Sequence, residues 1–120
     1  MALSRIAQMH ADEIRNHDWS DAHTRLDRAG HHRADDRTPR AAQMTHDEAE
    51  NVRVNVMWVT AQVLAYLDAN FDVVEFAQAC GVTNRHRTTG WLRAGLRGGD
   101  GHFQRPGTTL YDEDVTATTA

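Results

Sequence analysis

Five arginines near the carboxyl-terminal end of the chain are the residues best suited to bind a charged partner. The stretch 81–110 holds a single acid, Asp100, while the whole protein carries a net charge of −4. Its arginines are Arg85, Arg87, Arg93, Arg97 and Arg105. Arginine can form paired hydrogen bonds to phosphate and to guanine, and asparagine can do so to adenine. This concentration of positive charge in an acidic protein favours nucleic acid as the partner.

Histidines offer a second kind of chemistry. The chain has eight histidines, and six of them precede residue 50: His10, His17, His23, His31, His32 and His46. No two histidines have the four-residue spacing that would place two metal ligands on one helix face. We therefore expect surface histidines and neither a metal site nor another cofactor, although their nearby aspartates keep a divalent-metal site or a protein contact open.

Catalysis has no comparable support in the sequence. The chain contains no nucleophile elbow, no phosphate-binding glycine loop and no metal-protease helix motif. We therefore expect no catalytic residues and a protein that is not an enzyme.

Composition sets the broad class of protein. The 120 residues are 40% hydrophobic and 25% charged, which suits one small globular domain. The most apolar stretch, residues 52–67, is interrupted by polar residues, and the amino terminus lacks the apolar centre of a signal peptide. We expect a soluble cytoplasmic protein without membrane contact. Cys80 is the lone cysteine, and its apolar neighbours predict a buried side chain.

Two helices and a loop are expected in the amino-terminal third. The apolar spacing over Leu3–His17 predicts a helix. Its inward residues would be Leu3, Ile6, Met9 or His10, and Ile14. Ser20 and Asp21 suit the start of a short helix over 21–29, with Ala22, Leu26 and Ala29 on one face and Gly30 as its cap. Residues 31–40 are charged and polar, which predicts a connecting loop.

A long helix is expected next. Thr45 followed three residues later by Glu48 has the pattern of a capping box, so a helix should run from His46 to about Asp68. Apolar residues step by four and three along it, which predicts an amphipathic stripe facing the core. That stripe is Val52, Val56, Val59, Val63 and Tyr66, widened by Met57, Leu64 and Leu67.

The remaining elements are shorter. Residues 73–80 should form a helix with Val73 or Val74, Phe76, Ala77 and Cys80 inward, and Gly81 should supply a turn. A further helix is expected from about Arg87 to Leu96, with Trp91, Leu92 and Leu96 as its apolar contacts. Pro106 and Gly107 suit a turn that could join a small β-hairpin over 102–111.

Ala77, Gly81 and Val82 together resemble a helix-turn-helix motif. In that motif a small residue allows the two helices to cross closely, a glycine makes the turn, and the next apolar residue enters the core. With the preceding long helix and the following hairpin, the segment 46–111 resembles a winged helix-turn-helix domain. Arg87 and Gly90 fall at positions where the pattern expects core residues. A turn one residue longer would place Thr88, Trp91 and Leu92 inward instead.

The resemblance implies a fold class, a domain division and a set of contacts. The fold would be mainly α, with residues 1–44 as a helical extension and charged loop and 112–120 as a flexible acidic tail. The second helix of the motif would enter the major groove of double-stranded DNA as part of a small transcriptional regulator. The implied DNA-binding residues are Thr83, Asn84, Arg85, His86, Arg87, Thr89, Arg93, Arg97 and Arg105.

Protein partners remain a second hypothesis. A winged helix-turn-helix scaffold can equally serve as a protein-binding module, an inhibitor or adaptor, because a fold does not fix a function. The acidic amino-terminal half fits a protein partner, and the resemblance to DNA-binding regulators also raises a homodimer as an expectation.

Overall fold

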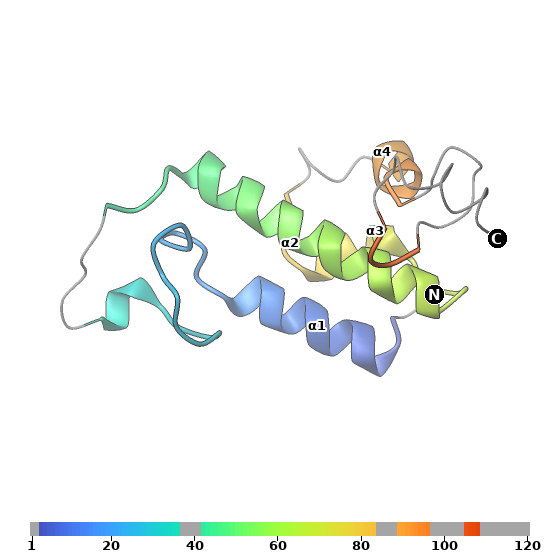
Figure 1. Ribbon diagram of the computed structural model, residues 1–120, viewed down its shortest axis with the longest axis horizontal. Helices are drawn as coiled ribbons and strands as arrows, with labels where there is room; N and C mark the ends of the chain where they lie inside the picture. The colour runs from blue at the N-terminus through green and yellow to red at the C-terminus, as the bar shows by residue number, and fades with distance from the viewer. Residues whose placement is uncertain (1–2, 37–41, 84–88, 97–104, 109–120) are drawn as a thin grey trace.

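The computed structural model describes residues 3–36, 42–83, 89–96 and 105–108, and over these ranges the protein is mainly helical, as predicted (Figure 1). The elements are α1 (Arg5–Asn16), a 3-10 turn η1 (Arg33–Asp35), α2 (His46–Leu67), α3 (Val73–Ala79) and α4 (Thr89–Ala94). Helices α1 and α2 lie side by side and antiparallel in Figure 1, and α3 packs against both. None of these helices is long and apolar enough to cross a membrane.

Side-chain caps fix where three of the helices begin. The Ser4 hydroxyl accepts a hydrogen bond from Ala7 N–H at the start of α1. The capping box at α2 is confirmed, since Thr45 N–H donates to Glu48 and Glu48 N–H donates to the Thr45 hydroxyl. The Asp72 carboxylate accepts from two backbone N–H groups of α3. These bonds satisfy donors that have no partner within the helix.

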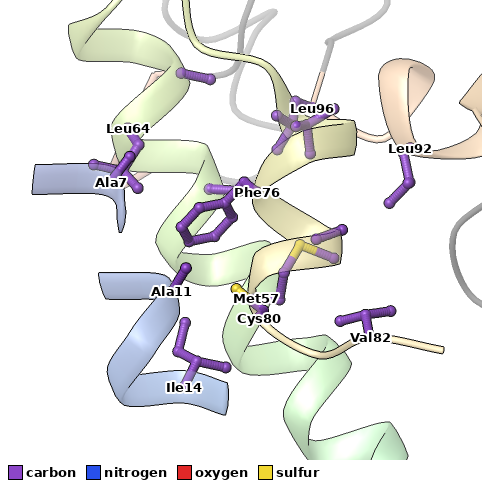
Figure 2. Packing of buried hydrophobic residues seen from close by; sticks show 14 of the residues in the cluster. Ala7, Ala11, Ile14, Met57, Leu64, Phe76, Cys80, Val82, Leu92 and Leu96 are labelled. Atoms are coloured by element: carbon purple, nitrogen blue, oxygen red, sulfur yellow. The ribbon is translucent and has the colours of Figure 1, made fainter. Parts of the chain in front are cut away.

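Helix α1 enters the core through small residues. Its buried residues are Ala7, Ala11 and Ile14, and Ala7 and Ala11 lie against the α3 residue Phe76 (Figure 2). The prediction that Ile6 and Met9 face inward is wrong, because their side chains are 63% and 58% exposed. Alanines one turn apart allow α1 to approach its neighbours closely, a benefit that hydrophobicity alone does not reveal.

Helix α2 buries a different face from the one predicted. Its buried apolar residues are Val54, Met57, Ala61, Leu64 and Ala65, so the widening residues Met57 and Leu64 are inward as expected. The rest of the predicted stripe is not in the core. Val59, Val63 and Tyr66 are 72%, 41% and 49% exposed, Leu67 is exposed, and Val52 and Val56 are half-buried.

Helix α3 completes the core as the sequence predicted. Val73, Phe76 and Ala77 are buried, and Cys80 follows them into the interior. Burial raises the pKa of the Cys80 thiol to about 12, so this thiol stays protonated and unreactive at neutral pH.

The predicted helix over 21–29 does not form. Residues 20–24 make a turn, and the Leu26 side chain is fully exposed rather than inward. The reason is that side chains here bond to each other and to the backbone, in competition with a helix. The Arg25 guanidinium contacts the carboxylates of Asp21 (2.9 Å), Asp27 (3.1 Å) and Asp36.

Histidines in this loop pack against neighbouring rings. The His17 ring lies 4.2 Å from that of Trp19 and 4.4 Å from that of His31, centroid to centroid. Burial, followed by the neighbouring His31, lowers the pKa of His17. In the part of the chain that the structure describes, no group of three histidine, cysteine or acidic side chains is arranged to hold a metal ion.

Asp18 should make this loop sensitive to acid. Burial alone would raise the pKa of Asp18, but hydrogen bonds from Arg33 N–H (2.6 Å) and from Ser20 lower it to about 2. The charged form is therefore favoured in the folded state, and its contribution is present above about pH 4 and lost as the pH falls towards 2. We expect Asp18→Asn to lower the free energy of unfolding at pH 7 by about 1 kcal/mol, allowing for partial exposure.

Urea unfolding at pH 7 and at pH 2.5 measures this effect. The difference between Asp18→Asn and the unmodified protein should shrink at the lower pH, whereas exposed Asp35→Asn should change little at either. A difference that stays constant with pH would contradict the assignment.

Candidate nucleic-acid interface

The turn after α3 has the geometry that the sequence predicted for Gly81. Gly81 adopts a φ of +81°, a backbone conformation that favours glycine. Val82 N–H donates to Ala77 C=O (3.1 Å), and Gly81 N–H donates to Gln78 C=O (3.1 Å). This pair of bonds is a Schellman motif, which ends α3 and turns the chain towards α4.

Two core positions of the expected motif, Ala77 and Val82, are buried as predicted. Ala77 has no exposed surface, and Val82 is 3% exposed. Helices α3 and α4 pack against each other, and Leu92 and Leu96 are buried behind α4, as predicted. Figure 2 shows Val82 and Leu92 at the α4 side of the core. Helices α3 and α4 therefore pack together with Ala77, Val82 and Leu92 buried, as predicted.

Trp91 is a correction to this picture. It was expected inward, but its side chain is 47% exposed. Its ring instead packs nearly perpendicular to the ring of Trp58 on α2, in a T-shaped contact with ring centroids 5.1 Å apart. Gly95 lies directly over Trp58, because a Cβ at this position would fall 2.5 Å from the Trp58 ring. The close approach of the residue after α4 to Trp58 therefore needs glycine at 95, which the sequence alone did not indicate.

A buried carboxylate anchors the turn, and sequence reasoning missed it too. Glu50 on α2 is 6% exposed, and its Oε1 accepts a hydrogen bond from Thr83 N–H (3.0 Å). Arg53 Nη1 lies 3.3 Å from Glu50 Oε2 and donates to Gly81 C=O (3.4 Å). Helix α2 thus holds the chain on both sides of Val82. One signal was available, because Glu50 shares a helix face with Val54 and Met57.

The structure places four of the predicted DNA-binding residues. Thr83, Arg93 and Arg105 are exposed, and Thr89 is the first residue of α4. The others, Asn84, Arg85, His86, Arg87 and Arg97, lie outside the described residues, as does Thr88. Most of the predicted hairpin does as well, and the described ranges contain no strand.

The turn at Arg105–Thr108 lies near the end of α4. Thr108 N–H donates to Arg105 C=O (3.3 Å), and Gly107 has a φ of +83°, as expected for a Pro-Gly turn. Pro106 and Gly107 share an apolar groove with Gly95 and with Trp58 of α2. The turn that begins at Arg105 therefore lies beside Gly95, which directly follows α4.

Comparison with known proteins identifies no relative, since no family model, curated protein sequence or solved structure matches the chain.

Proposed function

We propose that this protein binds double-stranded DNA and acts as a small sequence-specific transcriptional regulator with a winged helix-turn-helix arrangement. The observation that carries the proposal is the anchored glycine turn between α3 and α4. Gly81 sets the turn, Val82 enters the core, and Glu50 holds Thr83 at the point where the chain leaves for α4. A rigid turn of this kind is what a recognition helix needs if it is to present side chains to base edges.

The distribution of charge also supports DNA binding at this turn. The five arginines of residues 81–110 all follow this turn in the sequence, and Arg93 and Arg105 are exposed. Glu50, the acid closest to Thr83 among the described contacts, is buried and faces Arg53. Its negative charge is therefore partly compensated within the protein, which favours the approach of phosphates.

Two groups of residues have different roles in this proposal. Residues at and just before the start of α4 would contact bases and confer sequence preference: Thr83, Asn84, Arg85, His86, Arg87 and Thr89. Arg93 and Arg97, one helical turn apart in sequence, would contact phosphates together with Arg105. Phosphate contacts position the protein, whereas base contacts specify the sequence.

Alanine substitution should separate the two roles. Arg93→Ala and Arg105→Ala should each weaken binding to all duplexes by a similar factor, on the order of fivefold, because each loses one phosphate contact. Arg85→Ala and Arg87→Ala should each reduce the ratio of the affinity for the preferred duplex to the affinity for random duplexes by about 10-fold or more, because they lose base contacts.

Fluorescence anisotropy with a selected duplex and a random-sequence pool measures both effects. Arg28→Ala is the matched control, because Arg28 is exposed in the amino-terminal loop and should leave affinity unchanged. If Arg28→Ala and Arg93→Ala reduced affinity equally, binding would reflect overall charge rather than this surface.

A further inference from the structure

Arg15, in the last turn of α1, lies against the glycine turn that leads into α4. A Cβ atom added to Gly81 would fall 3.3 Å from Cγ and 3.9 Å from Cβ of Arg15, so the stem of this side chain covers the turn. Figure 2 shows Ile14, the neighbour of Arg15, at the same end of the core as Cys80 and Val82. The contact joins parts of the chain that are far apart in the sequence, so sequence spacing alone could not reveal it.

The charge of Arg15 is not engaged by any residue that the structure describes. Arg15 is exposed, and no described residue forms a hydrogen bond or an ion pair with its guanidinium group. Asp12, three residues earlier on α1, accepts a hydrogen bond from Gln8 Nε2 (2.9 Å) instead. Arg53 also reaches this turn, but its guanidinium lies 3.3 Å from the carboxylate of Glu50. Of the two arginines that meet at the turn, Arg15 is therefore the one whose charge is available to a partner.

The position of Arg15 places its charge beside the proposed DNA-binding residues. Thr83, the first residue proposed to contact bases, follows Gly81 by two positions, so their Cα atoms are at most about 7 Å apart. Thr83 is exposed, as Arg15 is. The phosphates of DNA border the groove that a recognition helix enters, so a cation beside the start of that helix can reach the backbone. Arginine suits this contact because its guanidinium group donates paired hydrogen bonds to phosphate oxygens.

We infer that Arg15 contacts a backbone phosphate of DNA next to the segment that contacts the bases, so that helix α1 forms part of the DNA-binding surface. This inference rests on the proposed binding of DNA. Arg15 is then a phosphate contact in addition to Arg93, Arg97 and Arg105. Residues 1–44 are likewise more than the extension that the sequence predicted, because they supply one of the contacts that position the protein on the duplex.

Anisotropy of the full chain with a random-sequence duplex pool, over a range of salt concentrations, tests the inference. Arg15→Ala should weaken binding about fivefold near 100 mM salt and reduce the magnitude of the salt slope by about 1, because one phosphate contact is lost. Arg15→Gln, which keeps the stem over Gly81, should behave in the same way. Arg15→Lys retains a cation there and should keep most of the affinity. Arg5→Ala is the matched control, because Arg5 is exposed about 15 Å further along α1 and should leave affinity and slope nearly unchanged.

Circular dichroism should show unchanged helical content in all four variants, because Arg5 and Arg15 are exposed on a helix. If the unmodified protein binds DNA and Arg15→Ala behaves like Arg5→Ala, the inference is overturned while the proposed function stands. A loss of affinity in Arg15→Ala without a change in the salt slope would also overturn it, because Arg15 would then support the turn and not contact a phosphate. Absence of binding by the unmodified protein would overturn the inference and the proposed function together.

Discussion

Phe76→Ala should lower the free energy of unfolding by about 3–5 kcal/mol, the largest effect expected of any single substitution in this protein. Phe76 has no exposed surface and lies where α1, α2 and α3 meet. Its ring faces Ala7 and Ala11 in Figure 2 and lies 5.3 Å from the Phe71 ring, centroid to centroid. Alanines on the neighbouring helix cannot extend to fill the space that the ring leaves, so the cavity should persist.

A loss of this size is a large part of the total stability of a small domain, about 5–15 kcal/mol. Urea unfolding followed by circular dichroism measures it. Gln78→Ala is the matched control, since Gln78 is exposed on the same helix and should change stability by less than about 0.5 kcal/mol. A loss below about 1 kcal/mol for Phe76→Ala would contradict the placement of Phe76 at the centre of the core.

Glu50→Ala should cost about 2 kcal/mol of stability and should also weaken DNA binding. Hydrogen bonds to a charged group contribute about 1.5–3 kcal/mol each. The substitution removes the acceptor of Thr83 N–H and leaves Arg53 without its carboxylate. The segment that leads into α4 would then lose its anchor, so affinity for the preferred duplex should fall more than affinity for random duplexes.

Glu50→Gln separates the hydrogen bond from the charge. Its amide oxygen can still accept from Thr83 N–H, so sequence preference should be retained, although the ion pair with Arg53 is lost. Unfolding and duplex binding are measured side by side for the two variants. Equal loss of sequence preference in both would show that the charge, and not the bond to Thr83, positions the turn.

The elements that the sequence predicts well are those set by local chemistry. Thr45 and Glu48 mark the start of α2 because both halves of a capping box lie within four residues. Gly81 marks the end of α3 because only a residue free to adopt positive φ suits that turn. Such signals depend on neighbouring residues alone, so they can be recognised from the sequence without the tertiary structure.

The faces that helices bury could not be predicted in the same way. Helix α2 has apolar residues on two sides, and the more regular stripe, with Val59 and Val63, is not the buried one. The core side includes Glu50 and Ala61, which weaken its apolar pattern. In α1, likewise, Ala7 and Ala11 are buried while the more hydrophobic Ile6 is exposed. Packing distance, rather than hydrophobicity, decides these cases.

The candidate site likewise contains residues that the sequence predicted and residues that it did not. Ala77, Gly81 and Val82 were predicted because the motif places them at fixed spacing. Glu50 and Gly95 were not, because each acts on a residue far away in the sequence, Thr83 in one case and Trp58 in the other. The failed helix over 21–29 has a similar cause, since Asp36 contacts Arg25 from eleven residues away.

The measurement that tests the DNA-binding proposal most directly is the salt dependence of duplex binding. Affinity of the unmodified protein for a random-sequence duplex pool is measured by anisotropy between 50 and 300 mM salt. If Arg93, Arg97 and Arg105 contact phosphates, the logarithm of the association constant should fall against the logarithm of salt concentration with a slope of about −3. Arg93→Ala should reduce the magnitude of that slope by about 1. Absence of binding, or binding that does not change with salt, would contradict the proposal.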